Sequence, residues 1–188
     1  MENIFFDLAR LASLGRGAIV GKTVRIRKPD RCRIGDYSIL DDFLYVSCAL
    51  IVGRYTHIGA NGSIIGGGGE VRIGDFVNIA PGCQIVSASH DFSQGGLAGP
   101  TIPKEMSGAV ITETVALDDH VLLGCQTVVL PGVHMPEGMA AGAMTLVTKQ
   151  DYEPWTLYAG VPARPVKPRQ REAILEQARR LASAPPDR

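Results

Sequence analysis

An aliphatic residue returns at every sixth position over most of this chain. Three runs follow this six-residue period, and their sixteen aliphatic positions are here called the beat residues: Ile34, Leu40, Val46, Val52, Ile58, Ile64; Ile73, Ile79, Ile85; and Ile111, Leu117, Leu123, Val129, Met135, Ala141, Val147. A six-residue repeat is typical of a parallel β-helix, in which each unit supplies one short strand and one corner. Three units close a coil of about eighteen residues with the beat side chains stacked inward. The sequence therefore predicts an all-β solenoid.

Segments outside the repeat complete the predicted domain plan. Residues 1–17 are expected to form a helical cap, because Leu8 and Leu11 follow helical spacing with other apolar residues. Residues 151–188 are expected to form a strap rich in proline and aromatic residues, followed by a helix from about Gln170 to Ala182. The β-helix itself is expected between these two segments, over residues 18–150.

Composition narrows the classes of function. The 19 basic and 19 acidic residues give a net charge of zero and a pI near 6.9, which disfavours binding to nucleic acid or an anionic membrane. Neither a run of 18 apolar residues nor a signal pattern is found, so a cytoplasmic protein is expected. The four cysteines are far apart, which argues against a zinc knuckle and a disulfide framework. Cys83 is expected to be a small buried thiol.

The longest interruption of the repeat, residues 87–108, is the first place to look for chemistry. A loop of this length in a regular solenoid is uncommon without a function. It contains His90, and an oriented imidazole near its free pKa is the usual general base at neutral pH. Four polar neighbours are candidates to orient the ring: Ser87, Ser89, Asp91 and Ser93. The other three histidines are expected to be packed or solvated corner residues.

Several local motifs accompany the hexads: the loop sequence SASHDFS at 87–93, PTIP at 100–103, the run LGC at 123–125, VTK at 147–149 and YAGVPAR at 158–164. Together with the repeat they resemble the hexapeptide-repeat acyltransferases. The chain looks most like the galactoside and maltose O-acetyltransferases and the sugar acetyltransferases of surface-polysaccharide pathways. The resemblance covers about residues 34 to 168 and implies a left-handed β-helix, assembled as a homotrimer with active sites between neighbouring subunits.

The resemblance also implies roles for individual residues. His90 matches the catalytic histidine, which takes a proton from the acceptor, and the backbone N–H of Cys125 matches the donor that meets the developing oxyanion. Acetyl-CoA is the implied co-substrate, and no metal is required. Its implied contacts are Cys125, Ala143, Thr148, Lys149, Arg164 and Lys167. The candidate acceptor contacts are Asn61, Asn78 and Asp91.

Two departures from the galactoside branch concern the acceptor. That branch places an acidic residue where this chain has Gly67 and Gly68, and Asn61 lies one place from the matching position, Ala60. The leading hypothesis is acetyl transfer to a sugar hydroxyl in surface-polysaccharide biosynthesis. The alternative is N-acetylation of a nucleotide-linked amino sugar.

The sequence disfavours two further classes of function. The γ-type carbonic anhydrases share the fold but need three histidine ligands for zinc, and this chain has Asp119 and Gly124 at two of those positions. A non-catalytic scaffold is disfavoured by the loop histidine and the basic strap.

Overall fold

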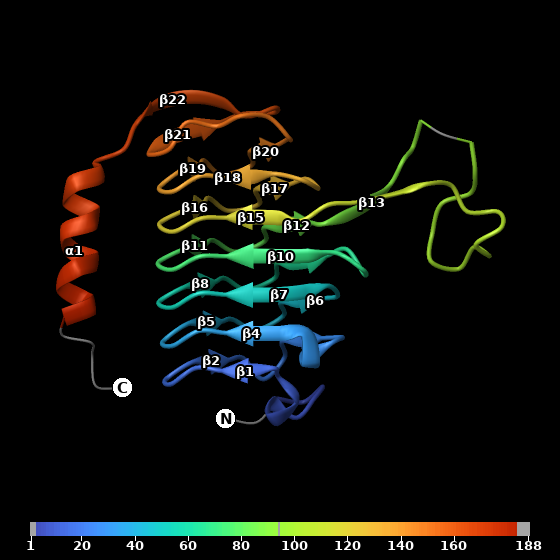
Figure 1. Ribbon diagram of the computed structural model, residues 1–188, viewed down its shortest axis with the longest axis horizontal. Coiled ribbons are helices and arrows are strands. Elements are labelled where there is room, and N and C mark those ends of the chain that lie inside the picture. Colours follow the sequence, from blue (N-terminus) through green and yellow to red (C-terminus); the bar gives the residue numbers. More distant parts are fainter. Residues whose placement is uncertain (1–2, 94, 184–188) are drawn as a thin grey trace.

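The computed structural model describes residues 3–93 and 95–183, and it is a left-handed parallel β-helix with its coils stacked from the N-terminus upward (Figure 1). Within these residues three parallel sheets form the sides of the prism. Sheet A holds β1 (Ser13–Leu14), β4 (Cys32–Ile34), β7 (Ala49–Val52), β10 (Glu70–Ile73), β15 (Val115–Leu117) and β18 (His134–Met135). Sheet B holds β2 (Ile19–Val20), β5 (Ile39–Leu40), β8 (His57–Ile58), β11 (Asn78–Ile79), β16 (Leu122–Leu123), β19 (Ala140–Ala141) and β21 (Thr156–Ala159), with β22 (Arg164–Pro168) added antiparallel. Sheet C holds β3 (Arg25–Ile26), β6 (Tyr45–Val46), β9 (Ser63–Ile65), β12 (Gln84–Val86), β17 (Val128–Val129) and β20 (Leu146–Val147).

The beat residues form the core, which confirms the predicted solenoid. Fifteen of the sixteen are at most 3% exposed, and the register pairs each with the beat residue of the next coil, as Ile58 pairs with Ile79 and Ile79 with Leu123. The exception is Ile111, which is 45% exposed because it lies outside the coils. Ile111 therefore fits the six-residue period by coincidence and is not part of the solenoid core.

The inserted segment projects from the solenoid as an arm, here defined as residues 87–114 (Figure 1). Its base is an antiparallel hairpin of β13 (Ala88–His90) and β14 (Val110–Thr112). The arm leaves the corner between sheets C and A, termed the C–A corner, which also includes residues 27–31, 47–48, 66–69 and 130–133. The segment 148–155 begins at this corner and runs past sheet A to β21. The B–C corner comprises residues 21–24, 41–44, 59–62, 80–83, 124–127, 142–145 and 160–163.

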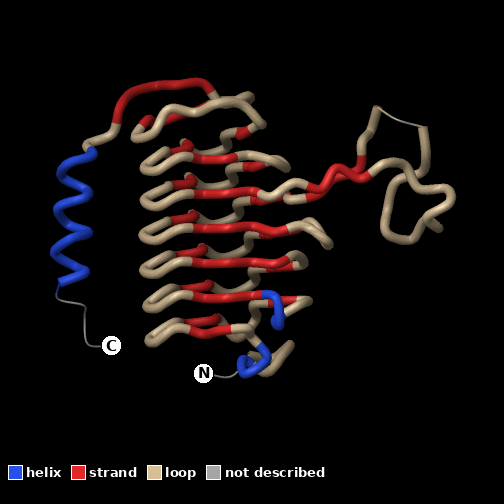
Figure 2. Tube along the Cα trace, viewed as in Figure 1, coloured by secondary structure: helices blue, strands red, loops and turns tan. Residues whose placement is uncertain are grey.

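The terminal segments cap and flank the prism. The N-terminal helix is a single 3-10 turn, η1 (Leu8–Arg10), and β1 begins within the residues expected for the cap, because the backbone is extended again at Leu11. Phe6 and Leu11 still bury against the core, each 8% exposed. The predicted C-terminal helix is confirmed as α1 (Arg171–Ser183), which runs beside the solenoid (Figure 2). No described helix is long and apolar enough to cross a membrane, and positions 184–188 lie outside the described residues.

Aromatic rings stack in a column along the corner between sheets A and B, where each coil turns through a residue with positive φ. Successive ring centroids lie 5.1, 5.3, 5.1 and 5.6 Å apart. The column consists of Tyr37, Tyr55, Phe76, His120 and Trp155. Offset stacking of this kind contributes about 0.5–1.5 kcal/mol per aromatic pair beyond area burial. The column therefore stabilises the stacking of the coils from outside the core.

Gly138 occupies the place in this column between His120 and Trp155. It has a φ of 69°, and a β-carbon built there would overlap the Trp155 indole. The missing side chain lets Trp155 reach across one coil and stack on His120. Trp155 is 8% exposed and packs the segment after β20 against the solenoid.

We expect Gly138→Ala to lower the free energy of unfolding by about 2–3 kcal/mol, because positive φ strain and displacement of the indole add together. Gly68→Ala is the matched control, since its β-carbon would meet nothing within 4 Å and its φ is ordinary, so the change should stay within about 0.5 kcal/mol. Urea unfolding of both variants measures the difference. Equal stability of the two would show that the column does not depend on this gap.

Candidate active site

The base of the arm and the next two C–A corners enclose a cleft of about 630 Å³. Its walls are largely apolar, with a few polar groups from the arm and from the last coil. The lining residues are Ser89, His90, Asp91, Phe92, Ser93, Ile111, Glu113, Leu130, Pro131 and Lys149. A mostly apolar cleft with a few converging polar groups is the usual form of a small-molecule site.

His90 is half-buried at the end of β13, where it faces this cleft. Its Nε2 accepts a hydrogen bond from the backbone N–H of Gly99 at 3.1 Å. Its Nδ1 is buried and has no hydrogen-bond partner among the described residues. An imidazole that accepts through Nε2 and is neutral carries its proton on Nδ1. To act as a base through Nε2, His90 therefore has to exchange the Gly99 amide for the acceptor.

The polar neighbours expected to orient the ring form hydrogen bonds within the arm and to the coil below, and their orienting role stays a prediction. Ser87 Oγ donates to the Ile65 carbonyl, and Ser89 Oγ donates to the His90 carbonyl. Asp91 Oδ1 accepts from both the N–H and the hydroxyl of Ser93, at 2.9 and 2.6 Å. These bonds shape the strand and turn that carry His90, and the loop amide of Gly99 orients the ring.

Lys149 lies in the same cleft, but its ammonium is engaged by a residue that the sequence did not single out. Nζ lies 2.9 Å from both carboxylate oxygens of Glu113, at the returning end of the arm. The pair ties the arm to the last C–A corner. Both side chains are more than a third exposed, so the pair contributes little to stability, and its role is positional.

Cys125 and Ala143 lie on the B–C corner, one coil apart, and both are exposed. Within the described residues the Cys125 N–H donates to no other group, so it is available to an anion. Sheet C separates this corner from the C–A corner that carries His90. Cys83, one coil below, is 3% exposed and burial raises the pKa of its thiol, in agreement with the expected buried thiol.

The remaining cofactor candidates lie at the C-terminal end of the solenoid. The Thr148 backbone is held at both its N–H and its carbonyl by the Tyr152 hydroxyl, at 3.2 and 2.7 Å. Arg164 and Lys167 are exposed on β22, and the Arg164 guanidinium donates to the neighbouring Ala163 carbonyl at 2.9 Å. Arg169 is half-buried: its guanidinium donates to the His120 carbonyl at 2.9 Å, and burial lowers its pKa.

The two asparagines proposed for acceptor binding lie apart from the cleft. Asn61 is an exposed B–C corner residue with a φ of 59°, a backbone conformation that asparagine tolerates. Asn78 lies on the outer face of sheet B, where its Oδ1 is 3.0 Å from His57 Nδ1. His57 Nε2 in turn lies 2.7 Å from Asp41. One chain thus brings His90, Asp91 and Lys149 together, and leaves the other candidates on different edges.

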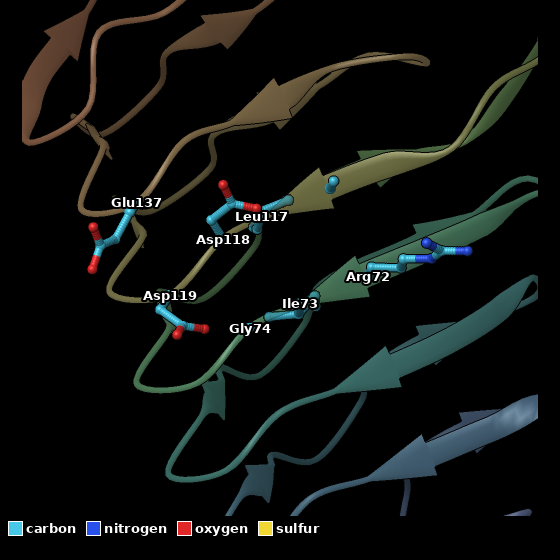
Figure 3. Close-up of a pocket in the computed structure, with 8 residues that line it drawn as sticks. Arg72, Ile73, Gly74, Leu117, Asp118, Asp119 and Glu137 are labelled. Atoms are coloured by element: carbon cyan, nitrogen blue, oxygen red, sulfur yellow. The ribbon is translucent and has the colours of Figure 1, made fainter.

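A second pocket of about 540 Å³ lies where sheet A meets sheet B and is lined by acidic side chains (Figure 3). Its carboxylates hold neighbouring groups: Asp119 Oδ1 accepts from the Asp75 N–H at 2.7 Å, and Asp118 Oδ2 lies 2.8 Å from His134 Nε2. No group of three or more metal-binding side chains is found in residues 3–93 and 95–183. These acids are therefore accounted for by the corners they stabilise.

Comparisons with known proteins extend over almost the whole chain. The chain is 32% identical over 179 residues to the dTDP-4-amino-4,6-dideoxy-D-glucose acyltransferase of Escherichia coli, which covers 90% of this chain and 91% of that protein. A crystal structure of a variant of AntD, an N-acyltransferase from Bacillus cereus, in complex with dTDP-4-amino-4,6-dideoxyglucose and coenzyme A superposes with a TM-score of 0.87 and 33% identity, covering 97% of this chain and all of that one.

More distant structures share the fold alone. A maltose O-acetyltransferase from Clostridium difficile superposes with a TM-score of 0.54 at 23% identity, covering 87% of this chain and 73% of that one. No family model matches the sequence. The relation to the Escherichia coli enzyme over nine-tenths of both chains, together with the left-handed β-helix, is sufficient for assignment. The chain belongs to the hexapeptide-repeat acyltransferases.

Proposed function

We propose that this acyltransferase moves an acyl group from an acyl-coenzyme A to the amino group of a nucleotide-linked amino sugar. The observation that carries the proposal is the similarity over nine-tenths of both chains to an enzyme whose acceptor is dTDP-4-amino-4,6-dideoxy-D-glucose. The AntD complex, which holds the same sugar nucleotide and coenzyme A, supports it. N-acetylation of a nucleotide-linked amino sugar is therefore preferred to O-acetylation of a polysaccharide sugar, because the similarity to the maltose O-acetyltransferase supports the fold only.

The chemistry follows from the cleft at the base of the arm. The sugar amine attacks the thioester carbonyl, and a tetrahedral intermediate forms with its negative charge on oxygen. His90 accepts the proton that the nitrogen loses, once the Gly99 amide has been displaced from Nε2. The free N–H of Cys125 stabilises the oxyanion. Collapse of the intermediate forms the amide and breaks the carbon–sulfur bond, and the departing thiolate takes up the proton.

We further propose that the active enzyme is a homotrimer in which His90 and Cys125 come from different copies. Within one chain the two residues lie on different corners, with sheet C between them. The arm extends away from its own solenoid, which leaves room for a neighbouring prism beside it (Figure 1). Side-by-side packing of the prisms would set the arm of one copy against the B–C corner of the next.

We expect the protein to release coenzyme A from acetyl-CoA in the presence of dTDP-4-amino-4,6-dideoxyglucose, and to do so much more slowly with maltose or a galactoside. The physical reason is that the protein groups that bind the diphosphate and the amine are left without partners when a neutral sugar occupies the site. Free-thiol release and mass spectrometry of the product measure this. Faster turnover with the neutral sugars would return O-acetylation to first place.

We expect His90→Ala to reduce turnover by about 10² to 10⁴, the usual effect of losing a positioned general base, while acyl-CoA binding persists. His134→Ala is the matched control, because that histidine is exposed and pairs with Asp118 outside the cleft. Steady-state kinetics with both substrates varied separates the two variants. Equal activity of the His90 variant and the control would remove His90 from the mechanism.

A further inference from the structure

Positive charge is concentrated where the first coil passes into the second, although the chain as a whole is neutral. Residues 22–33 contain six of the 19 Lys and Arg residues and a single acid, Asp30. Three of the six, Arg27, Lys28 and Arg31, fall within five residues at one C–A corner, between β3 and β4. Clustered cations repel one another, so an arrangement like this favours a negatively charged partner.

These three cations are not neutralised by the protein. Arg27 and Arg31 are exposed, and Lys28 is half-buried. Among the ion pairs formed by the described residues, none includes any of the three. Lys28 Nζ donates instead to the Gly67 carbonyl at 2.9 Å, which directs its ammonium upward along the corner. Arg27 likewise donates to a neutral group, the Tyr45 hydroxyl, at 3.5 Å. The described residues thus give these cations neutral hydrogen-bond acceptors but no counter-charge, which an anion would supply.

The cluster lies on the same edge of the prism as the arm. Backbone hydrogen bonds connect the successive coils at this edge. The Arg27 N–H donates to the Val46 carbonyl at 2.9 Å, the Ser47 N–H to the Ile64 carbonyl at 3.0 Å, and the Ser87 N–H to the Ile65 carbonyl at 2.7 Å. Figure 2 shows the short helical turn η2 (Pro29–Arg31) on the side of the solenoid from which the arm projects. Three strand spacings, about 14 Å, separate the Arg27 level from the base of the arm.

The corner directly below the arm has no side chains at its outermost positions. The turn at residues 66–69 consists of four glycines, and β-carbons at Gly67 or Gly68 would meet nothing within 4 Å. A glycine turn lets a ligand approach the backbone closely. The same turn lies directly below the arm, because a β-carbon at Gly66 would overlap Ser87.

We infer that Lys28 and Arg31, with Arg27, bind the diphosphate of the nucleotide-linked acceptor, whose sugar then lies over the glycine turn with its amino group at His90. This inference rests on the proposed function. Coenzyme A also carries phosphates, but its expected contacts, Ala143, Thr148 and Arg164, lie beyond the arm toward the C-terminal end. The arm would thus separate an acceptor side, toward the N-terminus, from a coenzyme side.

The test uses the full-length protein and the double variant Lys28→Ala/Arg31→Ala. The control is Lys22→Ala/Arg33→Ala, which removes the same charge from the same basic stretch, residues 22–33, at the B–C corner and on the face of sheet A. Calorimetric titration with dTDP alone should show affinity about tenfold weaker in the test variant and near wild type in the control, as expected for loss of charge-assisted phosphate contacts. The acceptor KM should rise by the same factor, with the acyl-CoA KM and the melting temperature unchanged.

Equal dTDP affinity in the test variant and the wild type would overturn the inference. A rise in the acyl-CoA KM alone would overturn it too and assign the cluster to the coenzyme. An equal loss of dTDP affinity in the test and control variants would show that only the net charge matters, and this too would contradict the inference. Absence of turnover with any nucleotide-linked amino sugar would refute the proposed function, whereas the dTDP titration would still decide whether the cluster binds a nucleotide diphosphate.

Discussion

The stacking of one coil on the next constrains everything else in this protein. Each strand is two to five residues long, so it is held by its hydrogen bonds to the coils above and below and by the beat residue it places in the core. A change of length within a strand would move the beat residue to the outer face. Extra residues can therefore be accommodated only at corners. The arm and the glycine turn at residues 66–69 both occur at the C–A corner.

This constraint explains which parts of the fold the sequence predicts. The solenoid, the arm and the C-terminal helix follow from periodicity, because each depends on residues close in the chain. The N-terminal cap does not: Leu8 and Leu11 have helical spacing, but Leu11 turns inward to close the core, so only one helical turn forms. Ile111 keeps the beat yet lies in the arm, since a local pattern does not record where a coil ends.

The site is less predictable because its groups meet through tertiary contacts. The sequence singles out His90 by its place in the longest interruption, and the structure places it in a cleft. The sequence does not reveal that Gly99 binds the imidazole or that Glu113 holds Lys149, because neither partner belongs to a recognisable motif. Asn61 and Asn78 are explained by a positive-φ corner and a His57 contact, respectively. The division of the candidates between two corners is a property of the prism, and it is the main reason for proposing a site shared between copies.

The most direct measurement of that central proposal is a crystal structure of the protein with coenzyme A and dTDP-4-amino-4,6-dideoxyglucose bound. The account predicts that the coenzyme thiol lies between His90 of one copy and the Cys125 N–H of its neighbour, with the sugar amine within hydrogen-bond reach of the His90 imidazole. Coenzyme A bound entirely within one copy, with His90 still held by the Gly99 amide and remote from the thiol, would contradict it.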